Sequence, residues 1–218
     1  MLLYTTTLSR LKLTCRSRLQ SSIGDIVAVH ISANTAIKPV YIQKGFLCAT
    51  SQWFVDALRF AGENGEADIL RFSDATPTTV QTFVYWLFHQ RIPDEDEVTG
   101  ILSTYAYQQL LCRAWVFADD RQIAKMQNAA IGALMEAFEV EPLKANLLNE
   151  ALQKTQMQSK LRRMLVEEAL LLETETRNGM LGKVKKEYLR GYLYDPMHAE
   201  RAFEARARRR GVAEDYYV

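Results

Sequence analysis

The residues of this sequence that could do chemistry are scattered along the chain. They form no CxxC pair, no disulfide framework, and no set of histidine, cysteine and carboxylate side chains at metal-ligand spacing. The odd number of cysteines favours reduced thiols in the cytosol or nucleus, and we expect neither a metal nor a cofactor. The residues concerned are Cys15, Cys48, Cys112, His30, His89 and His198.

Sequence motifs that mark catalysts do not occur. The chain contains no GxSxG elbow, no phosphate-binding loop, no GxGxxG, no HExxH and no calcium loop. The acidic run Asp94–Glu97 is typical of a solvated surface, and Asp119-Asp120 are interpreted as helix caps. Cys48 and His30 both fall in apolar segments, which favours a place in the core. We therefore predict that the protein binds rather than catalyses, and that it is not an enzyme.

Charge is distributed unevenly over the 218 residues, although the net charge is only +1. Residues 1–24 carry four basic residues and no acid, residues 25–173 carry 13 basic and 19 acidic residues, and residues 174–218 carry 10 basic and 7 acidic residues. An acidic body thus separates two basic ends. No apolar run reaches the roughly 18 residues that a membrane span needs, so we expect a cytoplasmic or nuclear protein without a membrane segment.

The basic N-terminal stretch, residues 1–24, is rich in Ser, Thr and Arg. This composition is typical of a mitochondrial transit peptide, but also of a flexible basic arm or of a short element that docks on the domain. We interpret it as a flexible arm, with mitochondrial targeting as the alternative.

Short β-branched and apolar runs predict three strands in the first part of the body. They are Ile26–Ile31 and Pro39–Ile42, which would pair as a hairpin, and Asp68–Phe72. A helix over 52–60 is predicted after Ser51, and another begins at Pro77 with Thr76 as its N-cap. In the second helix the stripe Val80, Phe83, Val84, Leu87 and Phe88 should be buried.

The rest of the chain is predicted to be helical. The run Asp94–Glu97 suits the start of a helix that breaks near Tyr107, and Asp119 or Asp120 should cap the following one. Two further apolar segments span 143–152 and 161–172, and Asn178-Gly179 should end the latter. These elements predict an α+β fold, a small three-stranded sheet covered by helices, with a domain over 25–140 and an all-helical extension over 141–218.

The same segments resemble the BTB/POZ family, in particular divergent members common in fungi. The resemblance covers about residues 25–173 and lies in the order of the motifs. Asp25 with IVAVHI resembles the first strand, and Ile42–Cys48 resembles "hydrophobic-His-Lys-x-x-Leu-Cys" with Gln43 in place of His. The later matches are Ser51 with Trp53-Phe54, Asp68–Phe72, Pro77 with Phe83–Phe88, Trp115–Asp119, Asn128 and Ser159–Val166.

The resemblance implies a protein–protein interaction module that acts as a scaffold or adaptor, with a homodimer as one arrangement. Asp25 and Lys44 match a charged pair of the family, which would either bind a ligand or pin the first strand to the first helix. Cullin-binding members use a hydrophobic-x-Glu motif, for which Ile92-Pro93-Asp94 is the nearest match here. A role as substrate receptor of a cullin ubiquitin ligase depends on that match.

A second hypothesis is a nuclear regulator associated with transcription or chromatin. It depends on the basic C-terminal tail, which could equally be a solvated helix end or a nuclear-localisation tract. Nucleic acid is a less favoured partner than protein, because the body is acidic and no zinc-finger or helix-turn-helix motif accompanies the tail. The tail residues are Arg206, Arg208, Arg209 and Arg210.

Overall fold

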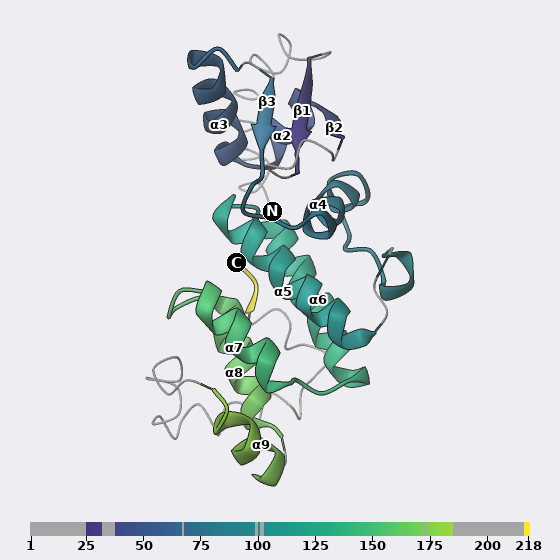
Figure 1. The fold of residues 1–218 in the computed structure, drawn as a ribbon, viewed down its shortest axis with the longest axis vertical. Coiled ribbons are helices and arrows are strands. Elements are labelled where there is room, and N and C mark those ends of the chain that lie inside the picture. The colour runs from purple at the N-terminus through teal and green to yellow at the C-terminus, as the bar shows by residue number, and fades with distance from the viewer. Residues whose placement is uncertain are drawn as a thin grey trace, which may run out of the picture. The chain divides into compact units, whose positions relative to one another are not determined.

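A computed structural model describes residues 25–31, 38–66, 68–98, 100, 103–172, 174–184 and 216–218. The chain divides into two compact units, one up to Val80 and one from Gln81 onward. The predicted α+β fold is confirmed: a small mixed sheet with helices is followed by a mostly helical region (Figure 1). The predicted arm over residues 1–24 and the arginine tail lie outside the described residues, and the domain boundary placed at residue 140 stays a prediction.

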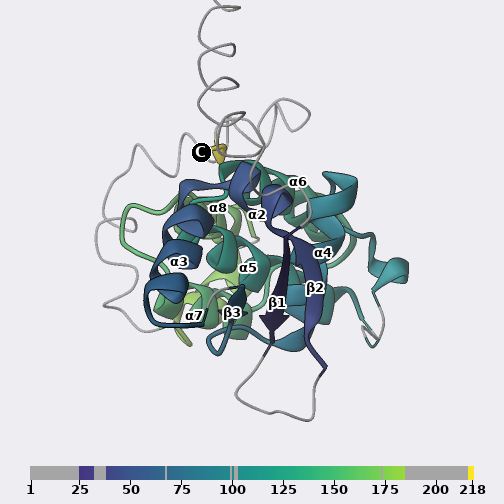
Figure 2. The same ribbon diagram turned by 90° about the horizontal axis from the view of Figure 1, so that it is seen from above.

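The sheet of the first unit has three strands in the order β2-β1-β3 (Figure 2). Strand β1 (Ile26–His30) pairs antiparallel with β2 (Val40–Gln43) and parallel with β3 (Ile69–Arg71). The three predicted strands are therefore confirmed, with ends that differ by at most one residue. Alternation along β1 fixes which face is buried, because successive side chains point to opposite faces. Val27 and Val29 are buried, whereas Ile26 is exposed.

Two helices, α2 (Lys44–Thr50) and α3 (Gln52–Glu63), accompany the sheet in this unit. The predicted N-cap of α3 is Ser51, but its side chain makes no capping hydrogen bond. Phe54 of α3 is fully buried and packs edge-on against Phe72, with ring centroids 6.4 Å apart. An aromatic pair of this kind adds about 0.5–1.5 kcal/mol beyond the area that it buries.

Helix α4 (Pro77–His89) begins as its sequence predicts. The backbone N–H of Thr79 donates to the Thr76 hydroxyl at 3.2 Å, which confirms the N-cap. Val80, Phe83 and Leu87 are buried as predicted. Val84 is only half-buried and Phe88 is 54% exposed, so the predicted stripe is wrong at these two positions. Phe88 lies one residue from the end of the helix.

Helices α5 (Thr104–Asp120) and α6 (Ala124–Val140) lie side by side in the second unit (Figure 1). Three expectations are wrong here. The acidic run forms a separate 3₁₀ turn, η1 (Glu95–Glu97), and α5 begins only after Ser103, whose side chain caps it. Helix α5 continues unbroken past Tyr107, because no glycine or proline interrupts residues 104–120. Neither aspartate at its end caps α6, because both still belong to α5.

The remaining helices are α7 (Ala145–Lys154), α8 (Lys160–Leu170) and α9 (Thr174–Leu181). The two predicted apolar segments correspond to α7 and α8. Asn178-Gly179 does not end α8, since it lies inside α9, so that expectation is wrong. Among the described helices, none is both long and apolar enough to cross a membrane.

A buried arginine joins α8 to the end of α7. Arg162 is 3% exposed, and its guanidinium donates to the carbonyl oxygens of Leu152 and Thr155. These carbonyls belong to the last turn of α7 and to its C-cap, where intrahelical partners are missing. A cation at this end also complements the helix dipole. Arg162 therefore adds to the C-terminal capping of α7, to which Thr155 contributes through its hydroxyl group, 2.7 Å from the Ala151 carbonyl.

Candidate interaction site

The segment between α4 and α5 holds a turn that is closed by its own acidic residues. Asp94 is the N-cap of η1, and its backbone N–H donates to Glu97 Oε2 at 2.9 Å. The Asp94 side chain accepts in return from the backbone of Glu97, which completes a capping box. The acidic run thus satisfies backbone groups at the start of the turn.

Arg91 and Tyr85 hold the same glutamate from the other side. The guanidinium of Arg91 donates to both carboxylate oxygens of Glu97, at 2.7 and 2.8 Å, and the Tyr85 hydroxyl donates to the same oxygens at 3.0 and 3.1 Å. These bonds, that of Arg91 foremost, lower the pKa of Glu97 to about 2. They also raise the pKa of Arg91, so the pair stays ionised throughout the physiological range.

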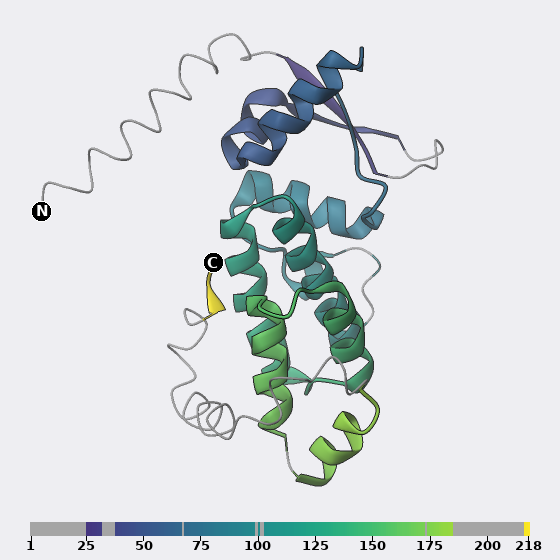
Figure 3. The ribbon, with the colours of Figure 1, turned by 90° about the vertical axis from the view of Figure 1, so that its left-hand side faces the viewer.

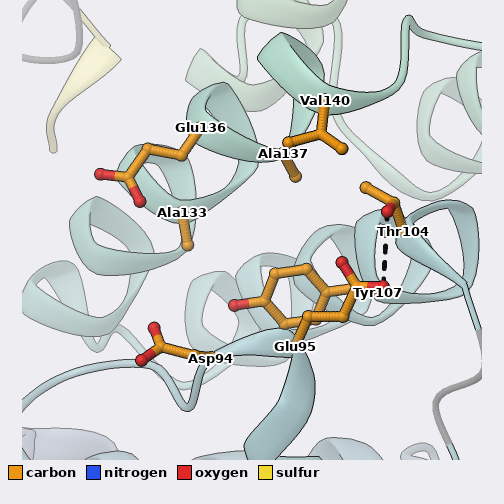
Figure 4. Close-up of a pocket in the computed structure, with 8 residues that line it drawn as sticks. All are labelled: Asp94, Glu95, Thr104, Tyr107, Ala133, Glu136, Ala137 and Val140. Carbon is orange, nitrogen blue, oxygen red and sulfur yellow. Dashed lines mark hydrogen bonds between the residues drawn. The ribbon is translucent and has the colours of Figure 1, made fainter.

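A shallow pocket of about 200 Å³ lies beside this turn. It is formed by the turn, the first part of α5 and the last part of α6 (Figure 4). Three carboxylates and one exposed aliphatic side chain, Val140, stand at its rim. The lining residues are Asp94, Glu95, Thr104, Tyr107, Ala133, Glu136, Ala137 and Val140.

Two hydroxyl groups of the pocket are held by hydrogen bonds within the chain. Tyr107 is 7% exposed, and its hydroxyl donates to the Pro93 carbonyl at 2.7 Å. Burial raises the pKa of this phenol, so it stays protonated at neutral pH. Thr104 donates to Glu95 at 3.3 Å, and in Figure 4 the carboxylates of Asp94 and Glu136 lie on the hydroxyl side of the Tyr107 ring. A cationic side chain next to a small apolar group would complement these features.

The two predicted residues of the nearest cullin motif, Ile92 and Asp94, lie in different surroundings, one buried and one exposed. Ile92 is 6% exposed, so its side chain belongs to the core of the unit. Asp94 is exposed, with its carboxylate 3.3 Å from Arg91. Asp94 therefore lies on a surface that a partner can reach, whereas Ile92 does not.

The ion pair expected between Asp25 and Lys44 is corrected by the structure. The Lys44 ammonium lies 3.3 Å from the carboxylate of Asp68, and Asp25 meets Lys44 only through its backbone carbonyl, at 2.9 Å from the Lys44 N–H. The reason is the sheet order, because β3 pairs parallel with β1. That pairing places Asp68, at the start of β3, where the sequence suggested Asp25.

Sequence reasoning missed Arg91, Tyr85 and Glu136. The six-residue spacing from Arg91 to Glu97 matches no helix pattern, because Pro93 and the turn intervene. Glu136 lies on α6, and only the tertiary packing of α6 beside α5 brings it to the pocket. No sequence pattern around Glu136 indicates that this residue lines the pocket.

No family model matches the sequence, and no curated protein matches it. In the described ranges, no group of three or more His, Cys, Asp or Glu side chains is placed to hold a metal ion.

Proposed function

We propose that the chain is a protein–protein interaction module of the BTB/POZ kind, which acts as a scaffold or adaptor. The order of its elements carries the proposal. An antiparallel hairpin is followed by two helices, a third strand parallel to the first, and then by helices alone. The sequence motifs that resemble the family fall on these elements in the same order.

The motif residues support a BTB/POZ-like fold, but they do not indicate which partner the chain binds. Val27, Leu47, Phe54, Phe83 and Trp115 all come from these motifs, and each is 2% exposed or less. Core residues of this kind set the packing, whereas the choice of partner depends on surface residues. The proposal therefore names a class of function and takes its candidate surface from the structure.

That surface is the acidic pocket beside η1. Its carboxylates come from both the turn and α6, and Val140 beside them is 74% exposed. Complementary charge raises the rate of encounter and selects among partners. A partner segment with a lysine or arginine next to an aliphatic residue would match it.

The narrower role of cullin receptor has less support. The nearest match to the motif, Ile92-Pro93-Asp94, has aspartate in place of glutamate, and its Ile92 is in the core. We expect no binding in a pull-down with a cullin, at concentrations where a positive-control BTB protein binds. Binding that is lost in an Asp94→Lys variant would restore the cullin role.

Affinity purification of the full chain, with quantitative mass spectrometry, tests the proposal. We expect a protein recovered in near-stoichiometric amount, and a marked loss of it with the charge reversal Glu136→Lys. Glu63→Lys is the matched control, because Glu63 is an exposed acid on α3, outside the pocket. A chain that recovers no such protein and stays monomeric at high concentration would contradict the proposal.

A further inference from the structure

Residues 216–218 lie on helices α6 and α8 of the second unit. In Figure 3 this short segment, drawn in yellow, runs beside the helices of that unit. Tyr216 is 4% exposed, and Tyr217, next to it, is 39% exposed. Tyr216 is thus buried against the helices, while Tyr217 stays at the surface. We call Tyr216 the anchor residue of this segment.

The anchor is bound by a charged pair on α8. The Tyr216 hydroxyl donates to Glu167 Oε2, while Arg163 Nε contacts Glu167 Oε1 at 2.9 Å. The guanidinium of Arg163 also lies over the Tyr216 ring, 5.3 Å from the ring centroid. This is within the roughly 6 Å over which a cation and an aromatic face attract one another. The Glu167 side chain is 4% exposed. A buried carboxylate needs a partner for each oxygen, and Tyr216 supplies the second one.

The backbone of the segment is bound by a side chain on α6. The Val218 N–H donates to Asn128 Oδ1 at 2.7 Å, and Asn128 Nδ2 donates to the Val218 carbonyl at 3.4 Å. A single amide that pairs with both main-chain groups of one residue recognises an extended segment without reading its side chain.

Gly132, one turn further along α6, lies beside the Tyr217 side chain. A Cβ atom at Gly132 would lie 3.9 Å from the Tyr217 hydroxyl, so a larger side chain would reach that ring. Asn128 and Gly132 are four residues apart, as are Arg163 and Glu167. Each pair therefore lies on one face of its helix. Together the two faces lie against the Tyr216 ring, the main chain of Val218 and the Tyr217 side chain.

We propose that Asn128, Gly132, Arg163 and Glu167 form a binding site for peptide segments of the type Tyr-aromatic-aliphatic. Residues 216–218 occupy this site as an intramolecular ligand, and a partner's segment binds only when they leave. The inference rests on the proposed function in one respect, that the ligand is a protein segment. A tethered ligand has an effective concentration near the millimolar range, so it holds off a free competitor of similar affinity.

The test uses the full chain and a fluorescent, C-terminally amidated peptide with the sequence of residues 213–218. Fluorescence anisotropy measures its binding to the wild type and to a Tyr216→Ala variant. We expect the variant to bind the peptide at least about tenfold more tightly, because its site is vacated. Adding Glu167→Gln to that variant should remove most of the gain.

Tyr216→Phe is the second variant, in case Tyr216→Ala unfolds. It keeps the ring but loses the hydrogen bond to Glu167, so its affinity for the peptide should lie between the other two. Tyr41→Phe is the matched control, because Tyr41 is a 68% exposed tyrosine on β2, and this variant should bind as weakly as the wild type. Equal affinity for the wild type and both Tyr216 variants, with their thermal melts intact, would overturn the inference. Recovery of a partner by the full chain would still stand in that case, so the two proposals fail separately.

Discussion

Two arginine–glutamate pairs in the helical unit are built in different ways. Arg91 and Glu97 are six residues apart on a surface turn, with side chains 47% and 35% exposed. Arg163 and Glu167 lie on one face of α8, and Glu167, at 4% exposure, is also bound by Tyr216. The first pair is completed by neighbours in the sequence, and the second by a residue 49 positions away. Burial makes the second pair depend on every partner, whereas water can replace a lost partner of the first.

The largest effect should come from the buried arginine beside this second pair. Arg162→Met removes the donors that satisfy the carbonyls of Leu152 and Thr155, and those carbonyls would stay buried. We expect the free energy of unfolding to fall by about 3 kcal/mol. Urea denaturation measures it, with Lys160→Met on the same helix as control. A loss no larger than that of the control would show that α7 needs no cap from α8.

The next effect concerns the carboxylate of the buried pair. Glu167→Gln keeps the shape of the side chain but removes the charge that Arg163 and Tyr216 contact, and should cost about 2 kcal/mol of unfolding free energy. A double-mutant cycle with Tyr216→Phe separates the tyrosine contribution. A coupling energy near zero would mean that Tyr216 is not held by Glu167.

The surface pair, Arg91 and Glu97, should affect how the melting temperature depends on pH in the acidic range. The pKa of Glu97 is about 2 in the folded chain, against an ordinary value of 4.5. A carboxyl group with a lowered pKa stabilises the fold above its ordinary pKa, and that stabilisation is lost as the pH falls from about 4.5 towards 2. The melting temperature should therefore fall less steeply over this interval in Glu97→Gln than in the wild type. Parallel curves of melting temperature against pH for the two proteins would show that the contacts of the turn do not lower the pKa of Glu97.

The smallest effect is expected in the first unit. Lys44 and Asp68 are 29% and 45% exposed, so their pair should contribute less than about 1 kcal/mol. Asp68→Asn keeps the side-chain volume, and its unfolding free energy should stay close to that of the wild type. Asp25→Asn is the matched control. A larger loss for Asp68→Asn would mean that the ion pair stabilises the start of β3.

The sequence predicted those features that depend on local patterns. The β-branched run of β1, the cap at Thr76 and the apolar segments of α7 and α8 are all local, and the structure confirms them. The acidic residues at 94–97 were placed at the start of a helix, but Pro93 and the bonds within the turn make a 3₁₀ turn of them. Local propensity could not reveal that Asp94 and Glu97 form hydrogen bonds with each other within this turn.

The candidate sites depend on contacts between distant parts of the chain, so sequence reasoning found little of them. Asp94 was predicted, while Glu136 reaches the same pocket only through the packing of α6 beside α5. The parallel pairing of β3 with β1 exchanged Asp25 for Asp68 as the partner of Lys44. The position of Tyr216 on α8 has no sequence signal, because its partner Glu167 precedes it by 49 residues.

One measurement tests the central claim, that this chain works by binding another protein, most directly. It is the binding isotherm of the purified full chain with the protein that it recovers, measured for the wild type, Glu136→Lys and Glu63→Lys. The account predicts saturable binding with a Kd below about 10 µM for the wild type and Glu63→Lys, and at least tenfold weaker binding for Glu136→Lys. Binding that fails to saturate for the wild type would contradict the claim.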